Sequence, residues 1–255
     1  MNDDSRAVAE NFEYIEGGHS LPEAGAKPVT PVPEIPEYLQ DTYWWAYLHP
    51  KSFYFFEREW VVNLILWGNM KRLTDAVLEE MSLAPQSKVL QVACVYGDFS
   101  NRVASHLDGS GSRLHIVDVA PIQIENVQKK VDGRNNVEAH LQDSTSMLFP
   151  SGTFDQTLVF FLLHEQPEYA RRKTVEEAIR VTRPGGKVIF VDYHGPKRSN
   201  PMRYVMKPIL ATLEPYAMDL WREELPAFMP ESVRPEQIQS EFYFGGLYQK
   251  IVLTV

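Results

Sequence analysis

The chain has 255 residues, enough for one α/β domain with a complete core and an additional segment. Its composition is that of a globular protein, with 44% hydrophobic and 23% charged residues, and its net charge of -9 argues against broad nucleic-acid binding. Cys94 is the only cysteine, which excludes an internal disulfide and suits a reducing cytosol. We find no signal peptide and no apolar run of bilayer-spanning length, and we expect a cytoplasmic protein.

Residues 1–35 are polar and rich in proline, with little hydrophobic periodicity. Such a segment buries too little apolar surface to offset the entropy lost on ordering. We therefore expect a disordered tail.

Residues 36–81 form an aromatic segment with helical character. Residues 53–67 are apolar on more than one face, which predicts a helix that is buried or that faces something other than water. An amphipathic helix then ends near Met81. Packing against the main domain is one interpretation; the other is a flat apolar pocket for an aromatic or quinonoid substrate, open towards lipid. The candidate substrate contacts are Tyr38, Tyr43, Trp44, Tyr47 and His49.

An α/β domain is expected over residues 82–255, starting with a buried strand, Val89 to Cys94. A turn closed by Gly97 leads to a helix over 100–107, and a second strand ends at Asp118, 21 residues beyond Gly97. An acid at this distance from the loop, at the carboxyl end of a strand, is placed to bind a ribose diol.

The remaining pattern predicts three more strands, over 137–141, 154–163 and 187–192, with helices over 122–131 and 169–181. Residues 194–240 form an insertion in which basic and apolar side chains alternate, typical either of a membrane-surface contact or of a solvated lid. Two strands around Gly245-Gly246 then close the chain. We predict a doubly wound, mostly parallel, seven-stranded sheet with an antiparallel C-terminal hairpin.

The order of these motifs resembles that of a class I methyltransferase domain: strand–loop–helix, Asp118 closing strand two, Asp143-Ser144 after strand three, and the turn 183–186 before strand five. A dehydrogenase that binds NAD, the competing interpretation, lacks that turn and the terminal hairpin. The resemblance implies S-adenosylmethionine as cofactor, with Asp118 on the ribose and Asp143 near the adenine amine. The implied cofactor contacts also include Gln91, Ala93, Val95, Gly97, Asp98 and Ser144.

A more specific resemblance rests on the strings 43–50, 64–69 and 95–98. They look like the rhodoquinone-biosynthesis methyltransferase-like family. That resemblance implies conversion of ubiquinone to rhodoquinone, in which an amino group replaces a ring methoxy group. It also implies S-adenosylmethionine as the amino donor and a requirement for Mn(II).

The loop departs from the common pattern acid-x-Gly-x-Gly-x-Gly, because Gln91, Ala93 and Val95 replace the acid and two glycines. Glycine lets backbone approach a ligand closely, and Val95 denies that approach. Ordinary drift in a loop that binds the same ligand is one explanation. The other is that the methionine end of the ligand lies differently. An amine that attacks a quinone must be neutral, and neutral Gln91 is consistent with that requirement.

Three residues are the predicted catalytic groups: Tyr96, Asp143 and His164. Asp143 and His164 are also the leading Mn(II) ligands, chosen from the strand-end set that includes Asp98, Asp118 and Glu165. The metal would polarise a quinone carbonyl. The alternatives are a hydrogen-bonded structural role for His164 and simple loop packing for Tyr96.

Three functions follow from the pattern. The leading hypothesis is an enzyme that transfers the amino group of S-adenosylmethionine to ubiquinone. Such an enzyme could contact the inner face of the membrane peripherally. The second is a methyltransferase acting on a quinone or another apolar aromatic. The third is a non-enzymatic ligand-binding scaffold of a quinone-synthesis complex.

Overall fold

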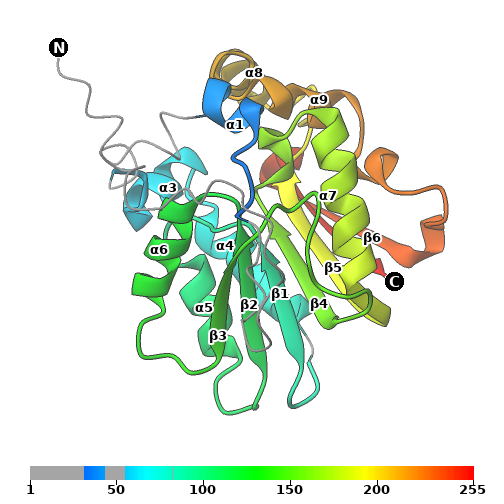
Figure 1. Ribbon diagram of the computed structural model, residues 1–255. Helices are drawn as coiled ribbons and strands as arrows, with labels where there is room; N and C mark the ends of the chain where they lie inside the picture. The colour runs from blue at the N-terminus through cyan, green and yellow to red at the C-terminus, as the bar shows by residue number, and fades with distance from the viewer. Residues whose placement is uncertain (1–31, 44–54, 82) are drawn as a thin grey trace, which may run out of the picture. The chain divides into compact units, whose positions relative to one another are not determined.

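The computed structural model describes residues 32–43, 55–81 and 83–255 (Figure 1). Most of the predicted tail lies outside these residues, as do three predicted substrate contacts, Trp44, Tyr47 and His49. Within the described part of the chain, no helix has both the length and the apolar character needed to cross a bilayer.

Seven strands form one sheet in the order β3-β2-β1-β4-β5-β7-β6. Their bounds are β1 Lys88–Val92, β2 Arg113–Asp118, β3 Val137–Leu141, β4 Phe154–Phe160, β5 Thr182–Tyr193, β6 Ile238–Tyr243 and β7 Tyr248–Thr254. Strands β1 to β5 pair in parallel, whereas β7 runs antiparallel to both β5 and β6. The predicted mostly parallel sheet with an antiparallel terminal hairpin is confirmed, although β6 begins within the predicted insertion.

Helices connect and cover the strands (Figure 1). Their bounds are α1 Glu37–Thr42, α3 Glu59–Ile65, α4 Met70–Glu80, α5 Phe99–His106, α6 Pro121–Lys130, α7 Glu168–Val181, α8 Met202–Leu213 and α9 Asp219–Arg222. In Figure 1, α1, α8 and α9 lie at the same end of the sheet.

The two faces of the sheet carry separate hydrophobic cores. Along β4, Leu158 and Phe160 belong to one core, which also contains side chains of α4, α5 and α6. Val159, between them, belongs to the other core, with side chains of α7. Successive side chains of a strand point to opposite faces, so this alternation is expected for a sheet covered on both sides.

Two strands end earlier than their hydrophobic pattern predicts. β1 was expected to run to Cys94 but ends at Val92, because Ala93 has a φ of 70°. β4 was expected to run to Leu163 but ends at Phe160, because Phe161 has a φ of 53°. A positive φ is incompatible with a strand, so the backbone turns sharply at both positions. β1 and β4 are neighbours, and the order of the strands along the chain reverses between them. Ligands of open α/β sheets bind outside the carboxyl ends of strands at such a point.

Candidate functional site

A cavity of about 1310 Å³, open mouth included, lies beyond the carboxyl ends of the parallel strands. Its wall is built from the segments that follow β1, β2, β3 and β4, together with Tyr193 at the end of β5. Apolar side chains of α1, α3 and α4 complete it, among them Leu39, Val62 and Met70.

The loop after β1 contributes Ala93, Cys94, Val95 and Tyr96 to the cavity wall. Ala93 has a left-handed backbone conformation that favours glycine, at the position of the first glycine of the common pattern. The loop thus keeps a backbone conformation that suits the glycine of the common pattern, and Ala93 is strained in that conformation.

Gln91 does not line the cavity. Its side chain is fully buried, and its Nε2 donates hydrogen bonds to the Ala93 carbonyl oxygen and to Ser100 Oγ, each at 2.9 Å. Both are groups of the protein itself, on the loop and on α5. Gln91 therefore holds the loop against the helix that follows it, and the segment 93–96 brings no carboxylate to the cavity.

Lys130, at the end of α6, holds the same loop from outside. Its Nζ donates to the carbonyl oxygens of Val95 (3.0 Å) and Gly97 (2.9 Å). The ammonium group also forms an ion pair with Glu57, whose other oxygen accepts a hydrogen bond from Asn126 Nδ2 at 2.7 Å. The loop is therefore tied both to α6 and to the aromatic segment.

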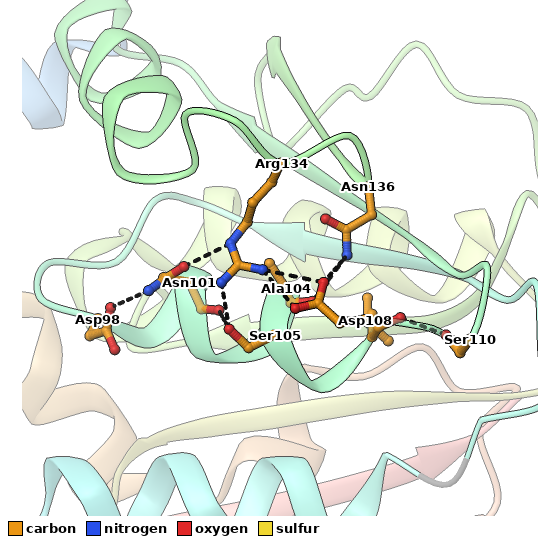
Figure 2. A network of polar contacts seen from close by, with 9 residues as sticks. Asp98, Asn101, Ala104, Ser105, Asp108, Ser110, Arg134 and Asn136 are labelled. Atoms are coloured by element: carbon orange, nitrogen blue, oxygen red, sulfur yellow. Dashed lines mark hydrogen bonds and ion pairs between the residues drawn. The ribbon is translucent and has the colours of Figure 1, made fainter.

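Asp98 was a predicted cofactor contact, but the structure places its carboxylate in a different network (Figure 2). Asp98 Oδ1 accepts a hydrogen bond from Asn101 Nδ2 at 3.0 Å, and Asn101 Oδ1 accepts one from Arg134 Nε at 2.9 Å. Arg134 also donates to Ser105 and Asp108 (Figure 2). This network ties α5 to the turn before β3. Neither Asp98 nor Gly97 lines the cavity, so their contact with a cofactor stays a prediction.

Asp118 lies at the end of β2 and lines the cavity. Its Oδ2 accepts a hydrogen bond from the Cys94 backbone N–H (2.7 Å), and its Oδ1 accepts one from the Ala120 N–H (2.9 Å). Burial raises the pKa of Asp118 to about 6, although these backbone donors act in the opposite direction. The carboxylate thus faces the cavity from a fixed position, as binding of a ribose diol requires.

Tyr96 lines the cavity between two partners. Its ring stacks on Phe56, with centroids 6.1 Å apart, and its hydroxyl accepts a hydrogen bond from Gln123 Nε2 at 2.9 Å. Burial raises the pKa of Tyr96 far above its usual value, so the phenol stays protonated.

Asp143 and Ser144 follow β3 and line the same cavity. Asp143 Oδ1 accepts the Thr145 N–H at 2.7 Å, and Ser144 Oγ lies 3.0 Å from Thr174 Oγ1. Gln166 Nε2 donates to Ser144 and Thr174, while the buried Gln166 Oε1 has no hydrogen-bond partner in the structure. Such an orphaned acceptor on a cavity wall suits a ligand that brings a donor.

His164 lines the cavity and lies close to several carboxylates. It is buried, and its Nδ1 lies 2.9 Å from Asp192 Oδ1, within ion-pair distance but not aligned for a hydrogen bond. Its Nε2 lies 3.7 Å from Glu165 Oε1. Burial alone would lower the pKa of His164, but the carboxylates of Asp192, Glu165 and Glu214 outweigh it and raise the pKa to about 9. A cationic ring is thus surrounded by three acids.

Glu214 was not anticipated from the sequence. It follows α8, lines the cavity, and has one buried oxygen, Oε2, without a hydrogen-bond partner. Burial raises its pKa, and the proximity of His164 opposes that rise. No local pattern marks Glu214, since it reaches the cavity only through the packing of the insertion. Lys130, Asp192 and Gln123 were missed as well; only Asp192, an acid near the end of a strand, carried a sequence signal.

Of the five candidate substrate contacts, the structure describes Tyr38 and Tyr43. Tyr43 is fully buried, 6.4 Å from the ring of Tyr216, and is not part of the cavity wall. Tyr38, also a candidate, does line it.

The predicted metal ligands Asp143 and His164 line one cavity, as do Glu165 and Glu214. Oxygen donors with a histidine form a set that suits Mn(II). A tighter group of donor atoms lies elsewhere, on the neighbouring strands β2 and β3, where His115, Glu138 and His140 have ligand atoms within 4.8 Å of one another. However, His115 Nδ1 and His140 Nε2 already form a hydrogen bond of 3.1 Å.

Comparison with known proteins agrees with this geometry. Residues 89–186 match the model of a methyltransferase domain family. A demethylmenaquinone methyltransferase of Staphylococcus saprophyticus is 25% identical over 134 residues, which cover 52% of this chain and 56% of that protein. An uncharacterised methyltransferase of Synechocystis is 26% identical over 152 residues, covering 60% and 67%. The chain thus spans little more than half the length of the first of these relatives.

Solved structures agree on the fold. Geranyl diphosphate C-methyltransferase of Streptomyces coelicolor superposes with a TM-score of 0.53 at 12% identity, covering 76% of this chain and 82% of that one. An N-methyltransferase of Bradyrhizobium japonicum gives 0.50 at 16% identity, covering 72% and 94%. The chain has a class I methyltransferase fold.

Proposed function

We propose that this chain is an S-adenosylmethionine-dependent transferase that acts on a quinone, and that the group it transfers is the amino group. In this proposal the substrate is ubiquinone and the product rhodoquinone, with Mn(II) required. The observation that carries the proposal is the cavity itself, in which Asp118, an acid-free loop and an apolar wall converge.

The position of Asp118 supports S-adenosylmethionine as the cofactor. Its carboxylate would accept hydrogen bonds from the ribose hydroxyls, and Asp143 would lie near the adenine amine. The fold and the match over residues 89–186 support the same cofactor. When bound, S-adenosylmethionine would supply either an amino group or a methyl group.

The wall of the cavity supports a quinone as the acceptor. Phe56, Tyr96, Phe161 and Tyr193 give it aromatic faces, against which a flat ring can pack. Relatives that bear the name demethylmenaquinone methyltransferase support the same class of substrate.

The loop after β1 favours amino transfer over methyl transfer. A carboxylate beside an amino group stabilises the ammonium form, which cannot attack a carbon atom. Gln91 replaces the acid of the common pattern, and its amide is bonded to the protein. The Val95 side chain projects where the common pattern has glycine, so backbone and ligand cannot approach closely there.

Around the reacting ring, the chain's own groups would supply protons and position. Without a metal, the pKa of about 9 keeps His164 protonated at neutral pH, so it would bind Mn(II) only after losing a proton. His164 would therefore serve either as the proton donor to a departing methoxy oxygen or as a metal ligand, but not as both at once. Tyr96, fixed by Gln123 and Phe56, would orient the ring.

Asp143 and His164 would hold Mn(II), with Glu165 and Glu214 as further donors on the same cavity wall. Among the described residues, these four are not a group whose donor atoms all lie within 4.8 Å of one another, so they would have to move closer together to hold the ion. The ion would act as a Lewis acid towards a quinone carbonyl.

Methyl transfer to a quinone is the second candidate, and the names of the relatives are the observation that favours it. One assay separates the candidates. Purified protein is incubated with S-adenosylmethionine, Mn(II) and either a short-chain ubiquinone or a short-chain demethylmenaquinone, which has a free ring position, and the products are weighed by mass spectrometry. Exchange of methoxy for amino makes the ubiquinone lighter, methylation makes the demethylmenaquinone heavier by one methylene, and a scaffold leaves both unchanged.

A further inference from the structure

Exposed apolar side chains are concentrated on two helices of the described chain. Nine of its thirteen exposed large hydrophobic residues belong to α8 or to α3 and its flanking residues. These nine are Phe55, Trp60, Leu64, Ile65, Trp67, Tyr204, Val205, Ile209 and Leu213. Exposed apolar side chains that are concentrated on a few elements can mark an interaction site. We call these nine residues the apolar surface.

The two helices are joined. Trp67 Nε1 lies 3.1 Å from Met206 Sδ, which links the turn after α3 to the middle of α8. Behind this contact, Leu66, Met206 and Leu210 belong to one hydrophobic core. On α8, the exposed residues Val205, Ile209 and Leu213 recur every fourth position, so they form one stripe beside the buried side chains of Met206 and Leu210.

The charge around α8 is the opposite of that of the whole chain. The chain has a net charge of -9, yet residues 193–213 contain four basic residues and no acid. Lys197, Arg198 and Lys207 are exposed, and no acid of the described residues forms a salt bridge with them. Basic side chains beside an exposed apolar stripe, with two exposed tryptophans nearby, are complementary to an anionic lipid surface.

The apolar surface adjoins the cavity. Ile65 is 43% exposed and also lines the cavity, together with Val62 and Leu66 of the same segment. Glu214, directly after α8, lines the cavity from the other helix. The apolar tail of a ligand that left the cavity past Ile65 would contact the apolar surface before it reached bulk water.

We propose that α3 and α8 form a docking surface for the anionic face of a lipid bilayer. Trp60, Leu64, Trp67, Val205 and Ile209 enter the headgroup region, and Lys197, Arg198 and Lys207 contact lipid phosphates. The cavity then opens towards the membrane, so a lipid-soluble ring enters while its tail stays among the acyl chains. This last point rests on the proposed quinone substrate, whereas the docking itself does not.

Vesicle co-sedimentation of the full chain tests the docking. We expect binding to vesicles of phosphatidylcholine with phosphatidylglycerol, and weaker binding to phosphatidylcholine alone. The double variant Leu64→Gln/Ile209→Gln should bind the anionic vesicles at least about tenfold more weakly, because two apolar side chains that enter the bilayer are lost. The triple variant Lys197→Ala/Arg198→Ala/Lys207→Ala should lose the preference for anionic lipid.

Leu148→Gln is the matched control, since Leu148 is as exposed (56%) but lies outside the apolar surface. It should bind vesicles like the natural chain, and thermal unfolding should show that all variants fold. Failure of the natural chain to bind, or an equal loss in Leu148→Gln, would overturn the proposal. So would a change from dimer to monomer in Leu64→Gln/Ile209→Gln with vesicle binding intact, because a second copy would then be the occupant.

Activity separates this proposal from the proposed function. Leu64 and Ile209 do not line the cavity, so the double variant should turn over a water-soluble short-chain quinone normally but a long-chain quinone in vesicles poorly. Vesicle binding without any quinone chemistry would support the docking and reject the substrate.

Discussion

At the scale of single residues, Asp118 makes cofactor binding depend on pH. Its pKa of about 6 belongs to the empty cavity, and only the ionised carboxylate can accept hydrogen bonds from both ribose hydroxyls. We expect the affinity for S-adenosylhomocysteine to be constant above pH 7 and to fall by up to about tenfold per pH unit below 6. Isothermal titration calorimetry over this pH range measures the affinity. Asp118→Asn should bind about 10–100-fold more weakly, without that pH dependence. An unchanged pH profile in Asp118→Asn would reject this role.

Val95 tests the choice between amino and methyl transfer. Val95→Gly restores a glycine of the common pattern and removes a side chain from the cavity wall. We expect amination of a short-chain ubiquinone to fall relative to methylation of a short-chain demethylmenaquinone, both measured by mass spectrometry, while Val95→Ile keeps the natural ratio. Gln91→Asp would not test this choice, because it would bury a carboxylate beside the Ala93 carbonyl oxygen and so destabilise the fold. If Val95→Gly aminates as the natural chain does, the loop does not set the reaction.

Glu214 tests the cation site. Glu214→Gln removes one carboxylate from the set around His164, so we expect the Kd for Mn(II) to rise at least about tenfold. Free Mn(II) can be measured by electron paramagnetic resonance. Glu223→Gln, at an exposed position nearby in the chain, should leave the Kd unchanged. Equal affinities in the two variants would remove Glu214 from the site.

At the scale of elements, Lys130 connects α6, the loop after β1 and the aromatic segment. Lys130→Met leaves Glu57 without its ion pair and two loop carbonyls without a donor, so the free energy of unfolding should fall by about 1.5–3 kcal/mol. Affinity for S-adenosylhomocysteine should fall as well, because Val95 and Tyr96 are no longer held in the cavity wall. Denaturant unfolding and calorimetry measure both effects. Lys129→Met, at an exposed neighbouring position, should change the free energy of unfolding by less than about 0.5 kcal/mol. A loss as large as that of Lys130→Met would contradict the role of Lys130 in holding the loop.

Most strands and helices follow from the hydrophobic pattern of the sequence. The observed ends of β2 and β3 are those predicted, although only β2 is largely buried. β3 lies at the edge of the sheet and is half-buried along its length. The premature ends of β1 and β4 could not be predicted, because Ala93 and Phe161 adopt positive φ values that their side chains do not favour. Of the segment 53–67, where a single helix was expected, the structure describes residues 55–67, and the helical conformation breaks at Glu57 and Arg58 before α3 begins.

The sequence allowed prediction of those residues of the candidate site that lie at the ends of strands. Asp118, Asp143 and His164 follow parallel strands, so topology alone brings them into one cavity. Glu214 and Lys130 come from an insertion and from the far end of a helix, and only tertiary packing brings them there. Gln91 was correctly identified as unusual, yet its contacts are with the loop and α5.

In the whole molecule, a class I methyltransferase fold carries both the cavity proposed to take a quinone and the surface proposed to bind lipid. The identity of the transferred group decides between amino and methyl transfer. The most direct measurement supplies S-adenosylmethionine with heavy nitrogen in its amino group and heavy carbon in its methyl group, together with Mn(II) and a short-chain ubiquinone. Mass spectrometry then follows each label. We predict that the quinone product carries the heavy nitrogen and has lost one methoxy group. A quinone that keeps both methoxy groups, or a product without the heavy nitrogen, would contradict amino transfer.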